Sequence, residues 1–166
     1  MENFIKLMLA FGIGLLLVLL AMPKVIPFLH KMKFGQVERE EGLESHKKKG
    51  GTPTMGGVVF VLAAVIAAFV VNYKNITNPN LILITIVLVG YSLIGFIDDA
   101  LIILKHQNEG LKAWQKFLMQ AILAVGCYLY LENFVPGFTT EVTIPIVKVN
   151  IDFGWFYAVL VFIMFT

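Results

Sequence analysis

Two adjacent carboxylates stand inside an apolar stretch of this sequence. Asp98 and Asp99 lie in the run GFIDDALIIL, residues 95–104, whose other members are glycine, alanine and large apolar residues. A charged carboxylate at membrane depth costs at least about 2.5 kcal/mol, and neighbouring carboxylates also repel each other. A cation, lysines from a neighbouring loop, a water-filled cleft or proton uptake by one member would compensate for this cost. The pair is therefore a candidate for proton transfer or for binding a metal ion.

A second polar segment, HKKKGGTPTMGG at residues 46–57, precedes another apolar run. Thr52 suits the N-cap of a helix, and Pro53 suits its first turn. A helix N-terminus beside a threonine hydroxyl and three lysines has the features that bind phosphate. Alternatively, the lysines anchor the chain at the membrane surface and the glycines pack against other helices. The segment taken alone leaves both interpretations open.

The elements that must position these residues are long apolar runs. The chain has 166 residues, of which 58% are hydrophobic and 14% are charged, whereas soluble domains carry about 25% charged residues. Its mean hydropathy is +0.83. A helix needs about 20 largely apolar residues to cross a bilayer. The predicted fold is an all-α polytopic membrane protein, a helical bundle in a single domain, with spans at residues 4–22, 55–71, 81–104, 117–135 and 153–166.

The fifth run has only 14 residues before the sequence stops, so we expect a fold truncated in its fifth span and a longer parent protein. A shallow terminal helix is the alternative, although the run has no amphipathic pattern. The first run, which is interrupted by Lys6, lacks a clear small-residue cleavage site and is predicted to be retained rather than removed as a signal peptide. The single cysteine, Cys127, excludes an intramolecular disulfide.

Basic residues are distributed unevenly among the connecting segments. Residues 23–54 hold seven lysines or arginines and residues 105–116 hold three, whereas the other two loops have one each. Such a bias predicts that the two basic loops are cytoplasmic and that the N-terminus lies outside. In the second outer segment, at about residues 139–152, apolar and polar residues alternate on both sides of Pro145. This pattern predicts a small outer β-hairpin.

The predicted orientation brings both polar segments to the cytoplasmic face, with the aspartates about 9–10 Å inside the last apolar residues of their span. Lysines and N–H groups that hold an anionic substrate, next to carboxylates that bind Mg²⁺ or accept a proton, describe phosphoryl transfer on a lipid carrier. Mg²⁺ suits the site because it needs only one or two protein carboxylates. The alternative is that the helix ends at Ile97 and the aspartates begin a loop.

The segment GTPTMGG at residues 51–57, followed one span later by GFIDDALIILKHQNEGLKAWQK, resembles the N-terminal half of the phospho-N-acetylmuramoyl-pentapeptide transferase family. The resemblance covers essentially the whole chain, and the family lies within the polyprenyl-phosphate sugar-phosphate transferase superfamily. It implies a multi-pass enzyme of the bacterial inner membrane with its active site on the cytoplasmic face. Such an enzyme transfers phospho-N-acetylmuramoyl-pentapeptide from UDP to undecaprenyl phosphate, giving lipid I and UMP with Mg²⁺. The pathway is peptidoglycan synthesis for the cell wall, on which cell shape and cell division depend.

The resemblance also implies roles for individual residues. Lys49 and Thr54 match the nucleotide or phosphate cradle, and the aspartates match an acidic pair that either deprotonates the lipid phosphate or positions the metal. Ile102 departs from the family pattern, because many relatives have a basic residue there; Lys105 or His106 are the candidates to replace it. The predicted catalytic residues are Asp98, Asp99 and Lys49, the predicted metal ligands are Asp98 and Asp99, and the predicted phosphate-binding residues are Lys48, Thr52, Thr54, Gly56, Gly57, Lys105 and Lys116.

The expected partners are UDP-N-acetylmuramoyl-pentapeptide, undecaprenyl phosphate and the lipid bilayer, with a homodimer as an open alternative and no nucleic acid. Because the family's later acidic and histidine motifs are missing from the chain, the 166 residues alone are predicted to be inactive. Two other functions stay open. One is a related transferase that moves a different sugar phosphate, and the other is a non-enzymatic membrane scaffold in which carboxylates and lysines pair across helices.

Overall fold

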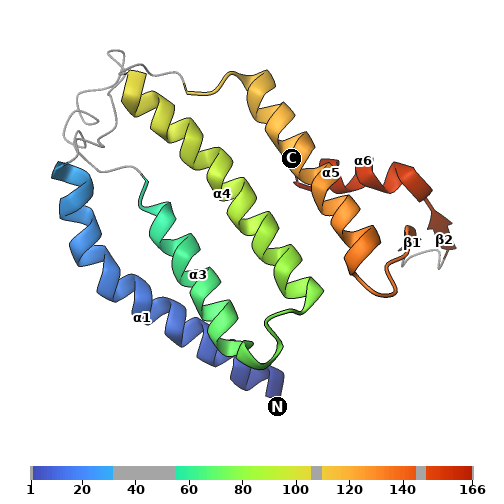
Figure 1. Cartoon of the computed structure of the whole chain (residues 1–166), viewed down its shortest axis with the longest axis horizontal. Coiled ribbons are helices and arrows are strands. Elements are labelled where there is room, and N and C mark those ends of the chain that lie inside the picture. Colours follow the sequence, from blue (N-terminus) through green and yellow to red (C-terminus); the bar gives the residue numbers. More distant parts are fainter. Residues whose placement is uncertain (1, 32–54, 106–109, 145–148, 166) are drawn as a thin grey trace. The chain divides into compact units, whose positions relative to one another are not determined.

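The computed structural model describes residues 2–31, 55–105, 110–144 and 149–165 (Figure 1). In this part of the chain, apolar helices dominate and two short strands form a hairpin, which confirms the predicted all-α membrane fold with a small β-hairpin. The helices are α1 (Glu2–Lys31), α3 (Gly57–Val71), α4 (Pro79–Lys105), α5 (Ala113–Phe134) and α6 (Tyr157–Phe165), the strands are β1 (Glu141–Ile144) and β2 (Val149–Asp152), and the 3-10 turns are Tyr73–Asn75 and Gly154–Phe156.

Among the described residues, three helices are long and apolar enough to cross a membrane: Asn3–Lys31, Pro79–Lys105 and Ala113–Phe134. Two further apolar helices, Gly57–Val71 and Gly154–Met164, are shorter. The individual span boundaries and the orientation in the membrane stay predictions.

The chain divides into two compact units, and the first comprises residues 1–76 and 92–112. In this unit α1 and α3 lie side by side and run antiparallel (Figure 1). Gly14 faces Ala67 near one end of the pair, where an added Cβ would stand 3.9 Å from the alanine Cβ, and Gly56 faces Met22 near the other. Val59, Ala63 and Ala67, spaced by four residues, form the buried stripe of α3. Such small residues let apolar helices approach each other closely.

The second unit comprises residues 77–91 and 113–166. Here Gly90 packs against α5 so tightly that an added Cβ would lie 2.7 Å from either terminal methyl of Leu123. Helix α6 contacts α5, and the Phe117 ring meets the Phe162 ring edge to face with centroids 5.0 Å apart. The core of this unit includes Ala124 and Cys127, which are 0% and 2% exposed.

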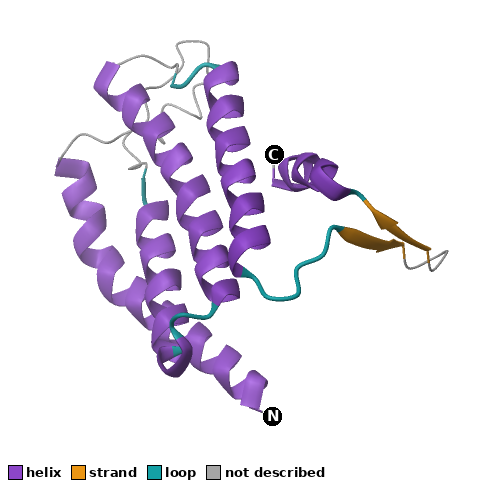
Figure 2. Cartoon of the chain, turned by 45° about the vertical axis from the view of Figure 1, so that its right-hand side comes forward, coloured by secondary structure: helices purple, strands orange, loops and turns teal. Residues whose placement is uncertain are grey.

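The hairpin joins α5 to α6 (Figure 2). Its strands are antiparallel, and the register pairs Glu141 with Asp152, Val142 with Ile151, Thr143 with Asn150, and Ile144 with Val149. Because side chains alternate along a strand, Glu141, Thr143, Asn150 and Asp152 share a polar face, while Val142, Ile144, Val149 and Ile151 share an apolar one. The alternation read from the sequence is therefore present in three dimensions.

Asp152 closes the open end of the hairpin. Its carboxylate accepts hydrogen bonds from the Thr140 hydroxyl and from the Gly154 backbone N–H, the latter at 2.9 Å. The Thr140 hydrogen bond, followed by the Gly154 hydrogen bond, holds the pKa of Asp152 below its ordinary value. Gly154 has φ of +49°, in the left-handed region that glycine adopts without strain. This glycine lets the chain leave β2 and turn into α6.

Several polar side chains on the apolar helices are paired within their own helix. Thr85 Oγ1 donates to the Leu81 carbonyl at 2.8 Å, Asn133 Nδ2 donates to the Leu129 carbonyl at 2.7 Å, and Asn72 Nδ2 donates to the Ala68 carbonyl at 2.9 Å. In each case the acceptor lies four residues earlier, one helical turn away. One donor of each side chain is therefore bonded without a neighbouring helix.

Candidate functional site

The acidic pair lies on α4, near its C-terminal end. The helix continues without a break from Pro79 to Lys105, so the alternative that it ends at Ile97 is wrong. Asp98 and Asp99 are both half-buried, and Asp98 precedes the end of the helix by seven residues, which corresponds to about 10 Å along the axis. A helix of this length and hydropathy thus carries two carboxylates close to one of its ends.

The carboxylate of Asp98 is held by the segment that follows α4. The backbone N–H of Leu111 donates to Asp98 Oδ1 at 2.7 Å. Gly110 lies against the same side chain: a Cβ added to it would come within 2.8 Å of both Asp98 Cγ and the Asp98 backbone oxygen. Only glycine permits this close approach without movement. The fold therefore fixes the orientation of Asp98 through the Gly110–Leu111 backbone.

Asp99 follows Asp98 on the same helix. Consecutive residues of an α-helix point about 100° apart, because one turn takes 3.6 residues. The two carboxylates therefore leave the helix in different directions, although both belong to the same turn. The contact with Gly110 and Leu111 distinguishes Asp98 from Asp99, a distinction that the sequence alone did not give.

The donor set fits Mg²⁺, which prefers oxygen ligands and retains several waters. Within the described parts of the chain, no group of three or more His, Cys, Asp or Glu side chains is placed to hold a metal. A magnesium ion bound by one or two carboxylates takes its remaining ligands from water and substrate phosphates, and such a site at Asp98 and Asp99 stays a prediction.

Four residues of the predicted phosphate cradle, Lys48, Lys49, Thr52 and Thr54, lie outside the described residues. The helix that was expected to begin after Thr52 begins at Gly57, with Gly56 as its N-cap. Met55 has φ of 70°, in the left-handed region, so α3 does not extend back through this residue. The prediction that Thr52 caps this helix and Pro53 forms its first turn is therefore wrong.

Gly56 and Gly57 lie at the N-terminus of α3, as its N-cap and first residue. A Cβ on Gly56 would make only an ordinary contact, 3.6 Å from Met22 Cε, and a Cβ on Gly57 would meet nothing within 4 Å among the described residues. Neither glycine is demanded by helix packing within this part of the chain. Gly56 is half-buried and Gly57 is exposed, and their part in a phosphate cradle stays a prediction.

The two remaining candidate lysines belong to different units. Lys105 is the last residue of α4 and shares a unit with the aspartates, at the helix end where a positive charge interacts favourably with the dipole. Lys116 lies in the first turn of α5, in the other unit.

The sequence did not predict the contacts of Gly110 and Leu111 with Asp98. The only sign of them in the sequence is the glycine in the loop KHQNEGLK, and glycine is common in loops of every kind.

Residues 49–61 match the family model described as phospho-N-acetylmuramoyl-pentapeptide-transferase signature 1. The chain is also similar to curated proteins of that name from Halalkalibacterium halodurans (42% identical over 159 residues), Bacillus subtilis (41% over 152 residues) and Staphylococcus epidermidis (44% over 155 residues). The similar regions cover 95%, 91% and 92% of this chain but 48%, 46% and 47% of the relatives. The chain thus spans about half the length of the curated relatives it matches.

Proposed function

Because the chain is related to the N-terminal part of the phospho-N-acetylmuramoyl-pentapeptide-transferases, we propose that it forms part of an enzyme that transfers phospho-N-acetylmuramoyl-pentapeptide from UDP to undecaprenyl phosphate. The products are lipid I and UMP, and the reaction belongs to peptidoglycan synthesis. The observation that carries the proposal beyond similarity is the oriented carboxylate of Asp98 near one end of a membrane-length helix. A lipid-borne phosphate meets a water-soluble nucleotide at this level of a bilayer.

In the proposed reaction, an oxygen of the lipid phosphate attacks the phosphorus that carries the sugar. The bond between that phosphorus and the bridging oxygen breaks, and UMP leaves with the bonding electrons. Such transfers depend mainly on positioning and on stabilising negative charge. Asp98 and Asp99 are proposed either to remove a proton from the lipid phosphate or to position a metal ion. Mg²⁺ bound at these carboxylates would neutralise charge on the phosphates.

The cradle for the nucleotide phosphates is proposed at the start of α3. Its members are Lys48, Lys49, Thr52, Thr54, Gly56 and Gly57, with Lys105 and Lys116 as further cationic contacts. The place of Gly56 and Gly57 at the N-cap and first position of α3 supports this role, since the first N–H groups of a helix have no partner within it and can bind phosphate. We further propose that this end of α3 faces the cytoplasm, that the N-terminus lies outside and that the membrane is the bacterial inner membrane. The hairpin then lies on the outer side.

The test uses the full-length protein, purified and supplied with UDP-N-acetylmuramoyl-pentapeptide, undecaprenyl phosphate and Mg²⁺, with UMP release as the readout. Asp98→Asn and Asp99→Asn are each expected to lower the turnover at least about 100-fold, the scale of lost acid–base or charge stabilisation. Glu141→Gln, which removes a carboxylate from the exposed hairpin, is the matched control and should leave turnover unchanged.

Two outcomes would reject the proposal. Turnover with UDP-N-acetylglucosamine but not with the muramoyl-pentapeptide donor would indicate a related sugar-phosphate transferase. A fully functional Asp98→Asn protein that is inserted in the membrane would indicate that the carboxylates serve only to pair helices, as in a scaffold.

Removal of Mg²⁺ with a chelator should abolish UMP release and re-addition should restore it.

A further inference from the structure

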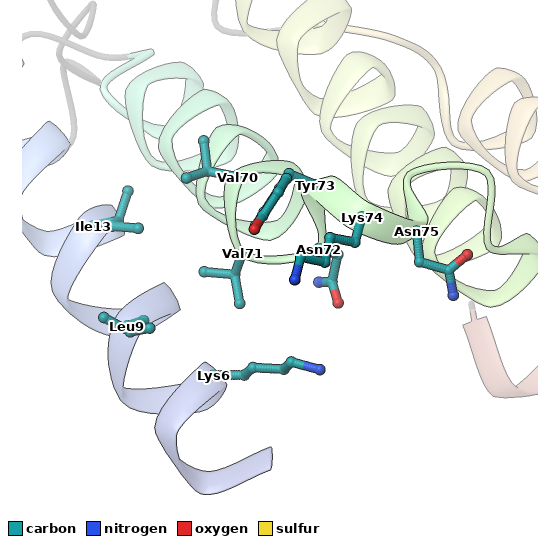
Figure 3. A pocket seen from close by; sticks show the side chains of 9 residues that line it. All are labelled: Lys6, Leu9, Ile13, Val70, Val71, Asn72, Tyr73, Lys74 and Asn75. Atoms are coloured by element: carbon teal, nitrogen blue, oxygen red, sulfur yellow. The ribbon is translucent and has the colours of Figure 1, made fainter. Parts of the chain in front are cut away.

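A groove of about 360 Å³ lies where the N-terminal part of α1 meets the end of α3 (Figure 3). All of its lining residues belong to one compact unit. Helix α1 contributes Lys6, Leu9 and Ile13, and the end of α3 with its following turn contributes Val70, Val71, Asn72, Tyr73, Lys74 and Asn75. The 15 residues of α3 span about 22 Å, so the groove is well separated from Gly57 at the other end of that helix.

The lining has two chemically different parts. Leu9, Ile13, Val70 and Val71 form an apolar wall, whereas Lys6, Lys74 and the two asparagines provide amines and amides. In Figure 3 the Lys6 side chain extends from α1 toward the turn that follows α3, where Asn72 and Lys74 lie. None of these nine lining residues is acidic. The groove therefore combines an apolar wall with positive charge at one end.

The position of the charges is informative. Lys6 is one turn from the start of α1 and Lys74 is three residues past the end of α3, so both lie at the ends of apolar helices. Lysines at such positions keep their aliphatic stems on apolar surface and their ammonium groups at the level of the lipid headgroups. Leu9 and Val70, which are 53% and 50% exposed, continue the apolar surface away from this level. The lysines therefore lie at the level of a phospholipid's phosphate, and the apolar residues lie at the level of its acyl chains.

We propose that this groove binds an anionic phospholipid. Its phosphate lies between Lys6 and Lys74, and the first part of an acyl chain packs on Leu9, Ile13 and Val70. Inorganic phosphate would leave that apolar wall uncovered, and a zwitterionic lipid would place its own cation among the lysines. The inference rests on α1 and α3 crossing the membrane, which is part of the proposed topology, but not on the transferase reaction.

The experiment measures binding of phosphatidylglycerol and phosphatidylcholine to the full-length protein by native mass spectrometry from mixed micelles. A basic residue near an anionic lipid surface contributes about fivefold to affinity. The Lys6→Gln/Lys74→Gln double variant should therefore bind phosphatidylglycerol about 25-fold more weakly, while phosphatidylcholine binding stays the same. The charge-retaining Lys6→Arg/Lys74→Arg variant should keep the wild-type preference. Lys31→Gln, at the other end of α1, is the matched control and should also retain it.

The proposal would be overturned if Lys31→Gln weakened phosphatidylglycerol binding as much as the double variant does. It would also be overturned if the wild-type protein bound phosphatidylglycerol and phosphatidylcholine equally. Displacement of phosphatidylglycerol by millimolar inorganic phosphate would also overturn it, because the site would then recognise phosphate alone. UMP release by the double variant is measured in parallel. Lost lipid preference with retained turnover supports the groove independently of the reaction, and retained lipid preference refutes the groove whatever the protein catalyses.

Discussion

Replacing Gly110 with alanine tests how Asp98 is oriented. The new Cβ would overlap Asp98 Oδ1 and stand 2.8 Å from Asp98 Cγ, whereas non-bonded carbons are comfortable at about 3.5 Å or more, so the loop backbone or the carboxylate must move by at least about 0.7 Å. The backbone at Gly110 is outside the left-handed region, so the alanine acts through this contact and not through φ. A shift of that size stretches the 2.7 Å hydrogen bond from Leu111 N–H toward 3.4 Å, beyond the normal range.

The expected effect on catalysis is larger than the effect on stability. A hydrogen bond to a charged group contributes about 1.5–3 kcal/mol, and half-burial places this one toward the lower value. A misplacement approaching 1 Å in a reacting group lowers turnover by up to about 100-fold. We expect Gly110→Ala in the full-length protein to lower kcat for UMP release between about 10- and 100-fold, with the thermal midpoint lowered by only a few degrees.

Gly126→Ala is the matched control, because a Cβ at Gly126 meets nothing within 4 Å among the described residues. A double-mutant cycle decides the cause: in an Asp98→Asn background, Gly110→Ala should have little further effect, since both changes act on one group. Wild-type kcat in a folded Gly110→Ala protein would refute the reasoning. Additive losses in the cycle would show that Gly110 acts elsewhere than on Asp98.

Two further predictions follow from contacts within the units, and a third follows because the chain spans about half the length of its relatives. Gly90→Ala should destabilise the full-length protein by about 1 kcal/mol, because the added Cβ displaces the terminal methyls of Leu123, and the same change should cost less in a Leu123→Ala background; an equal cost in both backgrounds in a thermal unfolding assay would contradict the observed packing. Because hydrogen bonds from Thr140 and Gly154 lower the pKa of Asp152, the hairpin gains stability above the ordinary aspartate pKa and loses it as pH falls through the lowered value. The protection factors of the hairpin amides, which compare each exchange rate with its intrinsic rate at the same pH, should therefore fall on acidification. Asp152→Asn should remove that pH dependence, and an unchanged dependence would place the titrating group elsewhere. The 166-residue polypeptide alone should show no Mg²⁺-dependent UMP release, and turnover by the purified polypeptide would refute this.

The sequence predicts the elements better than the contacts between them. The apolar run at residues 81–104 lies within α4, and the alternation around Val142 and Val149 appears as the hairpin, because length and period are local properties of the chain. The start of α3 was predicted four residues too early. A threonine is a favourable N-cap, but the backbone conformation of Met55 decides where the helix begins, and local preference does not reveal it.

The site is predicted less completely, for a physical reason. Asp98 is conspicuous in the sequence because a carboxylate among apolar residues is costly. Its contact with Gly110 and Leu111 joins groups 12 and 13 residues apart and depends on how the loop folds back, which residue types do not determine. The lysines and threonines at positions 48–54 lie outside the described residues, so their role in a phosphate cradle stays a prediction.

The hydrogen bonds that Thr85, Asn133 and Asn72 make to carbonyls of their own helices bear on how the protein is made. A helix that enters the bilayer during synthesis has no neighbours yet, and an unsatisfied donor would hold it back. Here one donor of each side chain is already bonded to the carbonyl one turn earlier once the helix has formed, with Asn72 bonding from the C-cap of α3. Partner choice after insertion then depends on shape, on Gly14 meeting Ala67 and Gly90 meeting Leu123, so entry into the membrane and assembly within it are governed by different residues.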